Sequence, residues 1–209
     1  MLQLYFWPMA CSLASRIALM EAGIEARYHL VHLWSKKRIE DDADFLAISP
    51  KGAVPVLILD SGDRLTESAA VLQYIADLNP HAELAPRPGD PGRYRLQEWL
   101  SFIGTEMHKG FLFPTFWYKD EAAKASARER IGQTVDHAAS HLAGRDYLVG
   151  DRFTVADGYL AWALLLLRHC GVDIDGRPQL ASYLARIRAR PMVSEAIRTE
   201  MALSKTVAP

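Results

Sequence analysis

Cys11 is one of two cysteines in this 209-residue chain, and its position suits a nucleophile. Alternating apolar residues over positions 2–6 predict a strand that ends at Pro8, and the apolar spacing of positions 13–21 predicts a helix. The first amides of a helix lack intrahelical partners and carry partial positive charge, so a sulfur there is stabilised as thiolate. Thiolate is the reactive form of cysteine. The position alone leaves an inert, buried apolar residue as an equally good interpretation.

A second group of residues suits a ligand that carries both an ammonium and a carboxylate. Ser68 opens a predicted helix, so its hydroxyl and amide suit a carboxylate, and Glu67 supplies an anion that suits an ammonium. Taken alone, the pair is more typical of a plain helix cap. Lys36 and Lys37 lie in a polar loop and are candidates to pair with another carboxylate, although such loops are usually only solvated.

A third group lies on the helix predicted from Pro91 to about Gly110. Ser101, Thr105 and His108 fall at i, i+4 and i+7, which predicts a polar stripe beside an apolar one. Solvated surface is the common explanation of such a stripe. Histidine is the side chain that ordinarily changes charge near neutral pH, so His108 is also a candidate to stabilise a thiolate or to relay a proton.

These residues need two kinds of domain to position them. Strand and helix signals alternate over residues 1–80 in the order βαβαββα, with the first two strands parallel and the last two forming a hairpin. Proline and glycine concentrate in residues 81–90, which predicts a linker. Residues 91–209 show only helix signals, and a capping sequence over residues 154–157 predicts the start of a core helix. The predicted fold class is therefore an α/β N-terminal domain followed by an all-helical C-terminal domain.

Composition excludes several classes of protein. The 24 Lys and Arg residues balance 25 Asp and Glu residues, which disfavours nucleic acid or an anionic membrane surface as a partner. Two cysteines cannot form a disulfide framework, so we expect a reducing compartment, by default the cytoplasm. The longest apolar run is too short to cross a bilayer, and the apolar N-terminus lacks the charged segment that a secretory signal would have. His137 and His141 have metal-chelating spacing but no third ligand in the sequence, so no metal is assigned.

Several strings, taken jointly and in order, resemble one family. Residues 10–14 (ACSLA), Val54-Pro55, Glu67-Ser68, Asn79-Pro80 and residues 106–111 (EMHKGF) resemble the cytosolic glutathione S-transferases, in particular the bacterial beta class. The resemblance spans nearly the whole chain. It implies a thioredoxin-like N-terminal domain of the order βαβαββα, followed by an all-helical C-terminal domain. It also implies a transferase that uses glutathione as co-substrate, needs no other cofactor, and forms a homodimer. One departure is Ser101, which stands where many relatives have asparagine.

The resemblance also assigns roles to residues. It implies that Cys11 either hydrogen-bonds the glutathione sulfur or forms a mixed disulfide with it. Because position 14 is alanine and not cysteine, an external thiol must release that adduct. It implies a cis Val54-Pro55 bond and pairing of the Val54 backbone with glutathione. The expected glutathione-binding residues are Cys11, Lys36, Val54, Pro55, Glu67, Ser68, Thr105 and His108, with Lys36 preferred slightly to Lys37. Cys11 and His108 are the expected catalytic residues.

An aromatic cluster follows the polar stripe. Its members are Phe111, Phe113, Phe116 and Trp117, with Tyr118 beside them. They either pack in the core or line an apolar pocket that accepts the electrophile. The expected activity is conjugation of glutathione to apolar electrophiles, with thiol transfer or peroxide reduction through Cys11 as an accompanying possibility. The alternative is a binding or adaptor protein that keeps the fold without turnover.

Overall fold

The computed structural model describes residues 1–117 and 119–207, and the chain divides into two compact units. Unit 1 comprises Met1–Leu84 and the segment that begins at Pro191, and unit 2 comprises Ala85–Arg190. The change of unit after Leu84 lies inside the segment predicted as a linker. The last helix, α8 (Pro191–Ser204), groups with unit 1, whereas the sequence analysis placed it with the C-terminal helices.

Unit 1 contains a mixed five-stranded sheet in the order β3-β2-β1-β4-β5. Strands β1 and β2 are parallel, with Leu4 beside Tyr28, and the other neighbours are antiparallel. The predicted βαβ start and the final hairpin are thus confirmed. The sequence analysis missed β3, because two basic residues show no apolar alternation. The strands are β1 (Leu2–Phe6), β2 (Ala26–His32), β3 (Lys37–Arg38), β4 (Val56–Ile58) and β5 (Arg64–Thr66).

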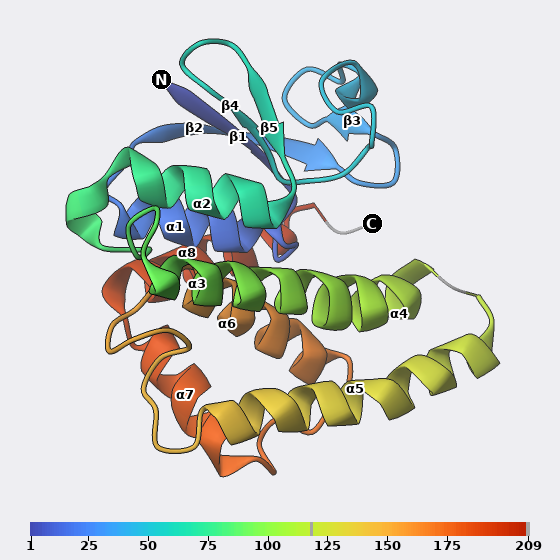
Figure 1. Ribbon diagram of the computed structural model, residues 1–209. Helices are drawn as coiled ribbons and strands as arrows, with labels where there is room; N and C mark the ends of the chain where they lie inside the picture. Colours follow the sequence, from blue (N-terminus) through green and yellow to red (C-terminus); the bar gives the residue numbers. More distant parts are fainter. Residues whose placement is uncertain (118, 208–209) are drawn as a thin grey trace. The chain divides into compact units, whose positions relative to one another are not determined.

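Helices α1 (Ser12–Glu21) and α2 (Ser68–Leu78) lie side by side along one face of the sheet, as Figure 1 shows. Their apolar i, i+4 positions are fully buried, for example Leu13 and Ile17 of α1. Helix α8 packs against α1 within the same unit. Short 3₁₀ helices η1 (Phe45–Ala47) and η2 (Pro80–Ala82) complete unit 1.

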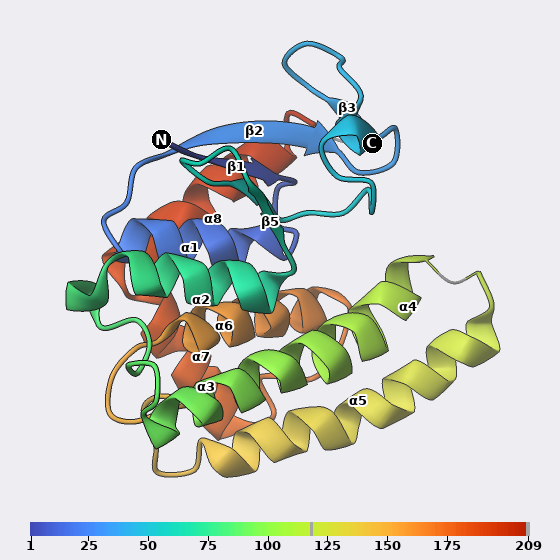
Figure 2. The ribbon, with the colours of Figure 1, turned by 45° about the horizontal axis from the view of Figure 1, so that its top comes forward.

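Within its described residues, unit 2 contains helices and no strand, which confirms the predicted fold class. Figure 2 shows α3, η3 and α4 as one continuous rod with α5 running back beside it. The elements are α3 (Pro91–Phe102), η3 (Ile103–Leu112), α4 (Phe113–Trp117), α5 (Glu121–His141), α6 (Val155–His169) and α7 (Pro178–Arg188). The capping sequence predicted at the start of α6 is present: the Asp157 carboxylate accepts from the Thr154 amide at 2.8 Å.

The segment η3 is a π-helix, whereas the sequence analysis predicted one α-helix to about Gly110. A π-helix joins residues five apart by hydrogen bonds, so the 3.6-residue period does not continue beyond Phe102. The close approach of Gly110 to the Thr105 carbonyl reflects this winding, because a Cβ at Gly110 would lie 3.0 Å from that oxygen. Ser101, Thr105 and His108 therefore do not form the regular stripe that was predicted.

Candidate active site

Cys11 lies at the N-terminal end of α1, as predicted. Its side chain is 6% exposed, and its Sγ donates a hydrogen bond to the Val54 carbonyl oxygen at 3.1 Å. The sulfur is the donor in that hydrogen bond and therefore carries its proton. The predicted thiolate would form when the sulfur leaves the carbonyl oxygen and accepts a hydrogen bond from a donor instead. The approach to Cys11 is a tight turn in which Met9 has φ of 61°, and the Ala10 amide donates to the Trp7 carbonyl at 3.1 Å.

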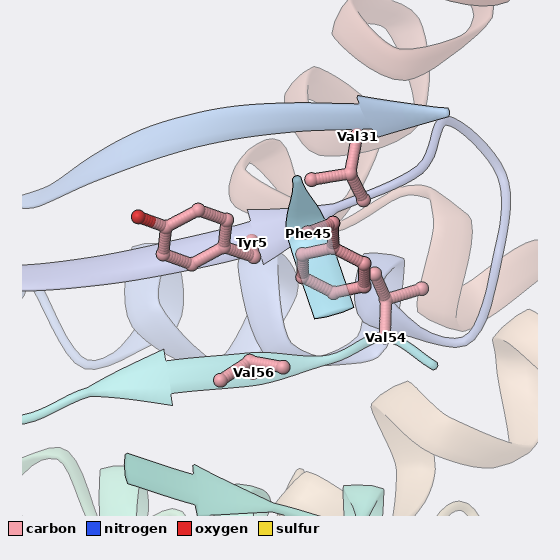
Figure 3. Packing of buried hydrophobic residues seen from close by; sticks show 5 residues of the cluster. All are labelled: Tyr5, Val31, Phe45, Val54 and Val56. Carbon is pink, nitrogen blue, oxygen red and sulfur yellow. The ribbon is translucent and has the colours of Figure 1, made fainter. Parts of the chain in front are cut away.

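The Val54-Pro55 peptide bond is cis, as the resemblance implied. Val54 belongs to a buried apolar cluster on the face of the sheet opposite to α1, and Figure 3 shows its members close together. Trp7, Ala10 and Ile48 are among the partly buried residues that pack against this cluster. The cluster contains Tyr5, Val31, Phe45, Val54 and Val56. It fixes the chain at Val54, and through the sulfur contact it also fixes Cys11.

Glu67 and Ser68 stand at the N-terminus of α2, again as predicted. Ser68 is buried, and Glu67 has φ of 69°, an uncommon conformation for a residue other than glycine. The Glu67 carboxylate accepts from the Lys51 ammonium at 2.6 Å, and Lys51 also donates to Thr66 Oγ1 at 3.1 Å. Sequence reasoning missed Lys51. Glu67 thus holds an ammonium in the structure, which is the charge type that it was predicted to bind.

Lys36 and Lys37 have different surroundings. The Lys36 ammonium donates to the Gly52 carbonyl at 2.7 Å, and burial lowers the pKa of Lys36. Gly52 has φ of 59°, a left-handed conformation that favours glycine, and a Cβ there would lie 3.1 Å from Lys36 Cε. Lys37 instead donates to the Asp42 carbonyl at 3.0 Å. Of the two lysines, only Lys36 contacts the segment that precedes β4 and contains Val54.

His108 and Thr105, two of the predicted site residues of unit 2, have different environments. His108 Nδ1 lies 3.0 Å from the Tyr159 hydroxyl, and its ring meets Trp162 edge to face at 4.9 Å. Tyr159, on α6, was missed because nothing in its helical spacing distinguishes a partner of histidine from core. Thr105 is exposed. The predicted approach of His108 and Thr105 to Cys11 joins the two units and stays a prediction.

The residues of the predicted acceptor pocket also differ in their environments. Phe111 is 1% exposed, which favours the core-packing alternative for this residue. Phe113 and Phe116 are exposed, and the Lys109 ammonium lies 5.1 Å from the Phe113 ring centre. The side chain of Trp117 and all of Tyr118 lie outside the described residues.

The two histidines with metal-chelating spacing have other partners. His141 Nε2 lies 2.9 Å from the Leu148 carbonyl, and the His137 ring stacks on Trp99 at 5.8 Å. Across residues 1–117 and 119–207, no group of three or more potential metal ligands lies together. Nor is any helix in those residues long and apolar enough to span a membrane.

One buried ion pair next to the Cys11 turn was not predicted. Glu200 of α8 accepts from the Met9 amide at 2.8 Å and from Arg16 Nε at 2.9 Å. The Arg16 guanidinium lies over the Tyr28 ring, 3.8 Å from its centre. Burial raises the pKa of Glu200 to about 7, although Arg16 acts in the opposite direction. The carboxylate joins the last helix to the turn that precedes Cys11.

Comparison with known proteins identifies the family to which this fold belongs. Residues 8–78 match the model of the glutathione S-transferase N-terminal domain, and residues 98–191 match that of the C-terminal domain. The chain is 37% identical over 200 residues to glutathione S-transferase GstA of Escherichia coli O157:H7, covering 95% of this chain and 98% of that protein.

Solved structures agree with the sequence matches. A sphingomonad glutathione S-transferase complexed with glutathione superposes with a TM-score of 0.91 at 42% identity, over 95% of this chain and 98% of the other. A bacterial beta class enzyme from Sphingomonas chungbukensis gives 0.89 at 40% identity, with the same coverage. The chain belongs to the glutathione S-transferase family, as the resemblance indicated. Within that family its similarity is to the bacterial beta class, and it is a transferase.

Proposed function

We propose that this protein binds glutathione on unit 1 and joins its sulfur to an apolar electrophile. The observation that carries the proposal is the contact of Cys11 Sγ with the Val54 carbonyl at the N-terminus of α1. This contact brings a polar sulfur, the first amides of a helix and an extended backbone segment to one place. The bound glutathione sulfur would sit against the same helix end, which stabilises a thiolate without a metal or cofactor.

The residues around this contact suit the remaining parts of glutathione. Ser68 and the N-terminus of α2 suit the γ-glutamyl carboxylate, and Glu67 suits its ammonium. Lys36 suits the glycyl carboxylate, because it already bonds to Gly52, two residues before Val54. Thr105 and His108 remain proposed contributors from unit 2, either of the same subunit or of a partner in a homodimer. Phe113 and Phe116 remain proposed for the electrophile.

The conjugation step balances without any further reactant. With 1-chloro-2,4-dinitrobenzene as probe, the glutathione thiolate forms a carbon–sulfur bond at the ring carbon that carries chlorine. The carbon–chlorine bond then breaks, and chloride leaves with the electron pair. The thiol proton passes to solvent. The enzyme contributes proximity and a favoured thiolate, and these act without a covalent enzyme intermediate.

Thiol transfer through Cys11 is the second candidate activity, and the isolation of this cysteine favours it over internal disulfide formation. The other cysteine, Cys170, ends α6 in unit 2, and burial raises its pKa. Cys11 thiolate would attack a glutathione mixed disulfide, take the glutathionyl group and release the other thiol. A second glutathione thiolate would then displace Cys11 and leave as oxidised glutathione.

Replacement of Cys11 by alanine tests both activities, with Cys170→Ala as the matched control. We expect Cys11→Ala to abolish reduction of mixed disulfides and to reduce conjugation of chlorodinitrobenzene less severely. Intact-mass measurement of the wild type with oxidised glutathione should reveal an adduct that the alanine variant lacks. Unchanged disulfide reduction in Cys11→Ala would remove this residue from thiol transfer.

Calorimetry tests the binding of glutathione directly. Lys36→Met should weaken binding about tenfold, as expected for loss of one charge-assisted hydrogen bond, and Lys37→Met should not. A folded wild type that does not bind glutathione would refute the proposal and favour an adaptor protein. The proposal further includes a homodimer in the cytoplasm, and sedimentation velocity tests the dimer.

A further inference from the structure

Lys51 belongs to the segment that precedes β4, and this segment contacts three parts of the proposed glutathione site. Two of the contacts are those of Val54 with Cys11 and of Gly52 with Lys36. The third is the contact of the Lys51 ammonium with the carboxylate at the start of α2. The segment therefore reaches the positions proposed for the sulfur, for the glycyl carboxylate and for the γ-glutamyl ammonium. Lys51 occupies the last of these positions itself.

A tight turn places Lys51 beside the start of α2. The Gly52 amide donates to the Ser49 carbonyl at 2.7 Å, which puts Lys51 at the third position of a four-residue turn. Ser49 is buried, and its hydroxyl donates to the Ala53 carbonyl at 3.1 Å. The backbone on both sides of Lys51 is therefore held by hydrogen bonds, and only its side chain is left to exchange partners.

Lys51 and Glu67 form an ion pair that a solute can reach. Lys51 Nζ lies 2.6 Å from Glu67 Oε1 and 3.1 Å from Thr66 Oγ1. The two charged side chains are 57% and 64% exposed, and an ion pair with this exposure contributes little to stability. The Glu67 backbone, in contrast, is held at φ of 69°, a costly conformation that persists where the surrounding structure fixes it. The carboxylate is thus fixed in place, whereas its cation is exchangeable.

We propose that Lys51 occupies the ammonium subsite of unit 1 until glutathione displaces it, an inference that rests on the proposed function. A primary ammonium is the group that Glu67 suits in glutathione, and Lys51 presents the same group to the same carboxylate. Binding therefore exchanges one ion pair for another. Glutathione gains from Glu67 only the difference between the two pairs, so Lys51 lowers the affinity for glutathione.

Displacement of Lys51 is favoured over sharing of the carboxylate. Glu67 carries one negative charge, and two ammonium groups held against it would repel each other. The amino group of glutathione is the part of the ligand that enforces the exchange. A ligand that lacks this amino group leaves the Lys51–Glu67 pair intact. Lys51 is therefore a specificity residue that acts only on ligands that carry an ammonium.

The test compares the binding of glutathione with that of deaminoglutathione, in which hydrogen replaces the α-amino group, by calorimetry. Lys51→Met removes the competing charge and should tighten glutathione binding about two- to fivefold, the range expected for one exposed ion pair. Binding of deaminoglutathione should not tighten. Lys51→Arg keeps the ion pair and should bind glutathione as the wild type does. Lys37→Met removes another exposed lysine, which bonds to the Asp42 carbonyl, and as the matched control it should not tighten binding.

Glu67→Gln supplies the second half of a double-variant cycle. In that background Lys51→Met should no longer tighten glutathione binding, because the charge for which the two ammonium groups compete is gone.

Two results would overturn the inference and leave the proposed function standing. One is unchanged or weaker glutathione binding in Lys51→Met, and the other is equal tightening for glutathione and deaminoglutathione. Weaker binding of both ligands would show that Lys51 holds a carboxylate of glutathione instead. A folded wild type that does not bind glutathione would refute the proposed function, and this inference with it.

Discussion

Unit 1 and unit 2 each contain a buried carboxylate, but they satisfy it in different ways. Asp157 of unit 2 is fully buried and accepts hydrogen bonds from neutral donors, whereas Glu200 of unit 1 pairs with the Arg16 guanidinium and one amide. Burial raises the pKa of both carboxyls. The donors to Asp157 are the Leu148 amide at 2.9 Å, the Thr154 amide and hydroxyl at 2.8 Å, and the Tyr183 hydroxyl at 2.7 Å.

The two carboxylates also differ in the parts of the chain they connect. The partners of Asp157 lie 3, 9 and 26 residues away, so it organises the start of α6 and its immediate surroundings. The partners of Glu200 lie 184 and 191 residues away, so it joins the end of the chain to the turn before Cys11. A local polar network stabilises one helix start, and a long-range ion pair positions a site. The predictions below separate these two roles.

Removal of Asp157 should have the largest effect on stability. Asp157→Ala leaves several buried donors without an acceptor, and we expect the free energy of unfolding to fall by about 4 kcal/mol. Urea denaturation followed by circular dichroism measures the change. Asp151→Ala removes a solvent-exposed carboxylate of the preceding loop and should cost less than about 0.5 kcal/mol. A loss at Asp157 as small as this control would mean that the network does not stabilise α6.

Removal of Glu200 should cost about 3 kcal/mol, because Glu200→Ala leaves the buried Arg16 charge without a partner. It should also loosen the turn at Met9, so that Cys11 reacts severalfold faster with iodoacetamide. Glu200→Gln keeps an acceptor for the Met9 amide and should change alkylation less. Asp157→Ala, assayed below its unfolding transition, should leave alkylation unchanged. Equal alkylation rates in all four proteins would separate Glu200 from the Cys11 turn.

The pH dependence of stability should report Glu200. Its pKa in the folded state is about 7, above the ordinary value of 4.5. At a pH between these two values, Glu200 is protonated in the folded protein and ionised in the unfolded chain. The stabilisation from this group is therefore complete below about pH 4.5 and is lost as pH rises through about 7. Between pH 5 and 8 this should amount to roughly 2 kcal/mol of unfolding free energy. Glu200→Gln should remove that slope, and identical slopes in the two proteins would contradict the assignment.

Much of the fold could be predicted because it follows from local spacing. The apolar periods of two and 3.6 residues identified β1, α1 and α2, and the switch from strand to helix placed Cys11 at a helix start. The π-helix could not be predicted in this way, since the same residues also fit a period of 3.6. The bond between Glu200 and Met9 could not be predicted either, because burial of a charge pair depends on tertiary packing between distant segments.

The candidate site was predictable to the same extent. Glu67 and Ser68 were found because a helix start has a sequence signal, whereas Lys51 has none that links it to Glu67. The contact between Trp7 and His32, whose ring centres lie 5.2 Å apart, did have a signal that sequence reasoning passed over. Trp7 and His32 stand at the ends of two predicted parallel strands, and parallel strands bring their ends to one edge.

The smallest effect should come from removing one donor of the Asp157 network. Tyr183 is buried, and burial together with Asp157 holds its pKa well above the ordinary value, so its hydroxyl stays a proton donor. Tyr183→Phe should lower the free energy of unfolding by about 1 kcal/mol, because one of several hydrogen bonds is lost while the ring is kept. The exposed Tyr94→Phe is the control and should cost close to nothing.

The pH dependence of the Tyr183→Phe deficit distinguishes a lost hydrogen bond from lost packing. The Tyr183 hydroxyl lowers the pKa of Asp157 against the larger effect of burial, so its removal should raise that pKa further. A higher folded-state pKa makes the protonated form more favourable, so the deficit of the variant should shrink as pH falls and Asp157 takes up its proton. A deficit that is constant with pH would show that Tyr183 acts through packing alone. In that case the Asp157 network would resemble an ordinary apolar core and not the charge-stabilising arrangement inferred from its donors.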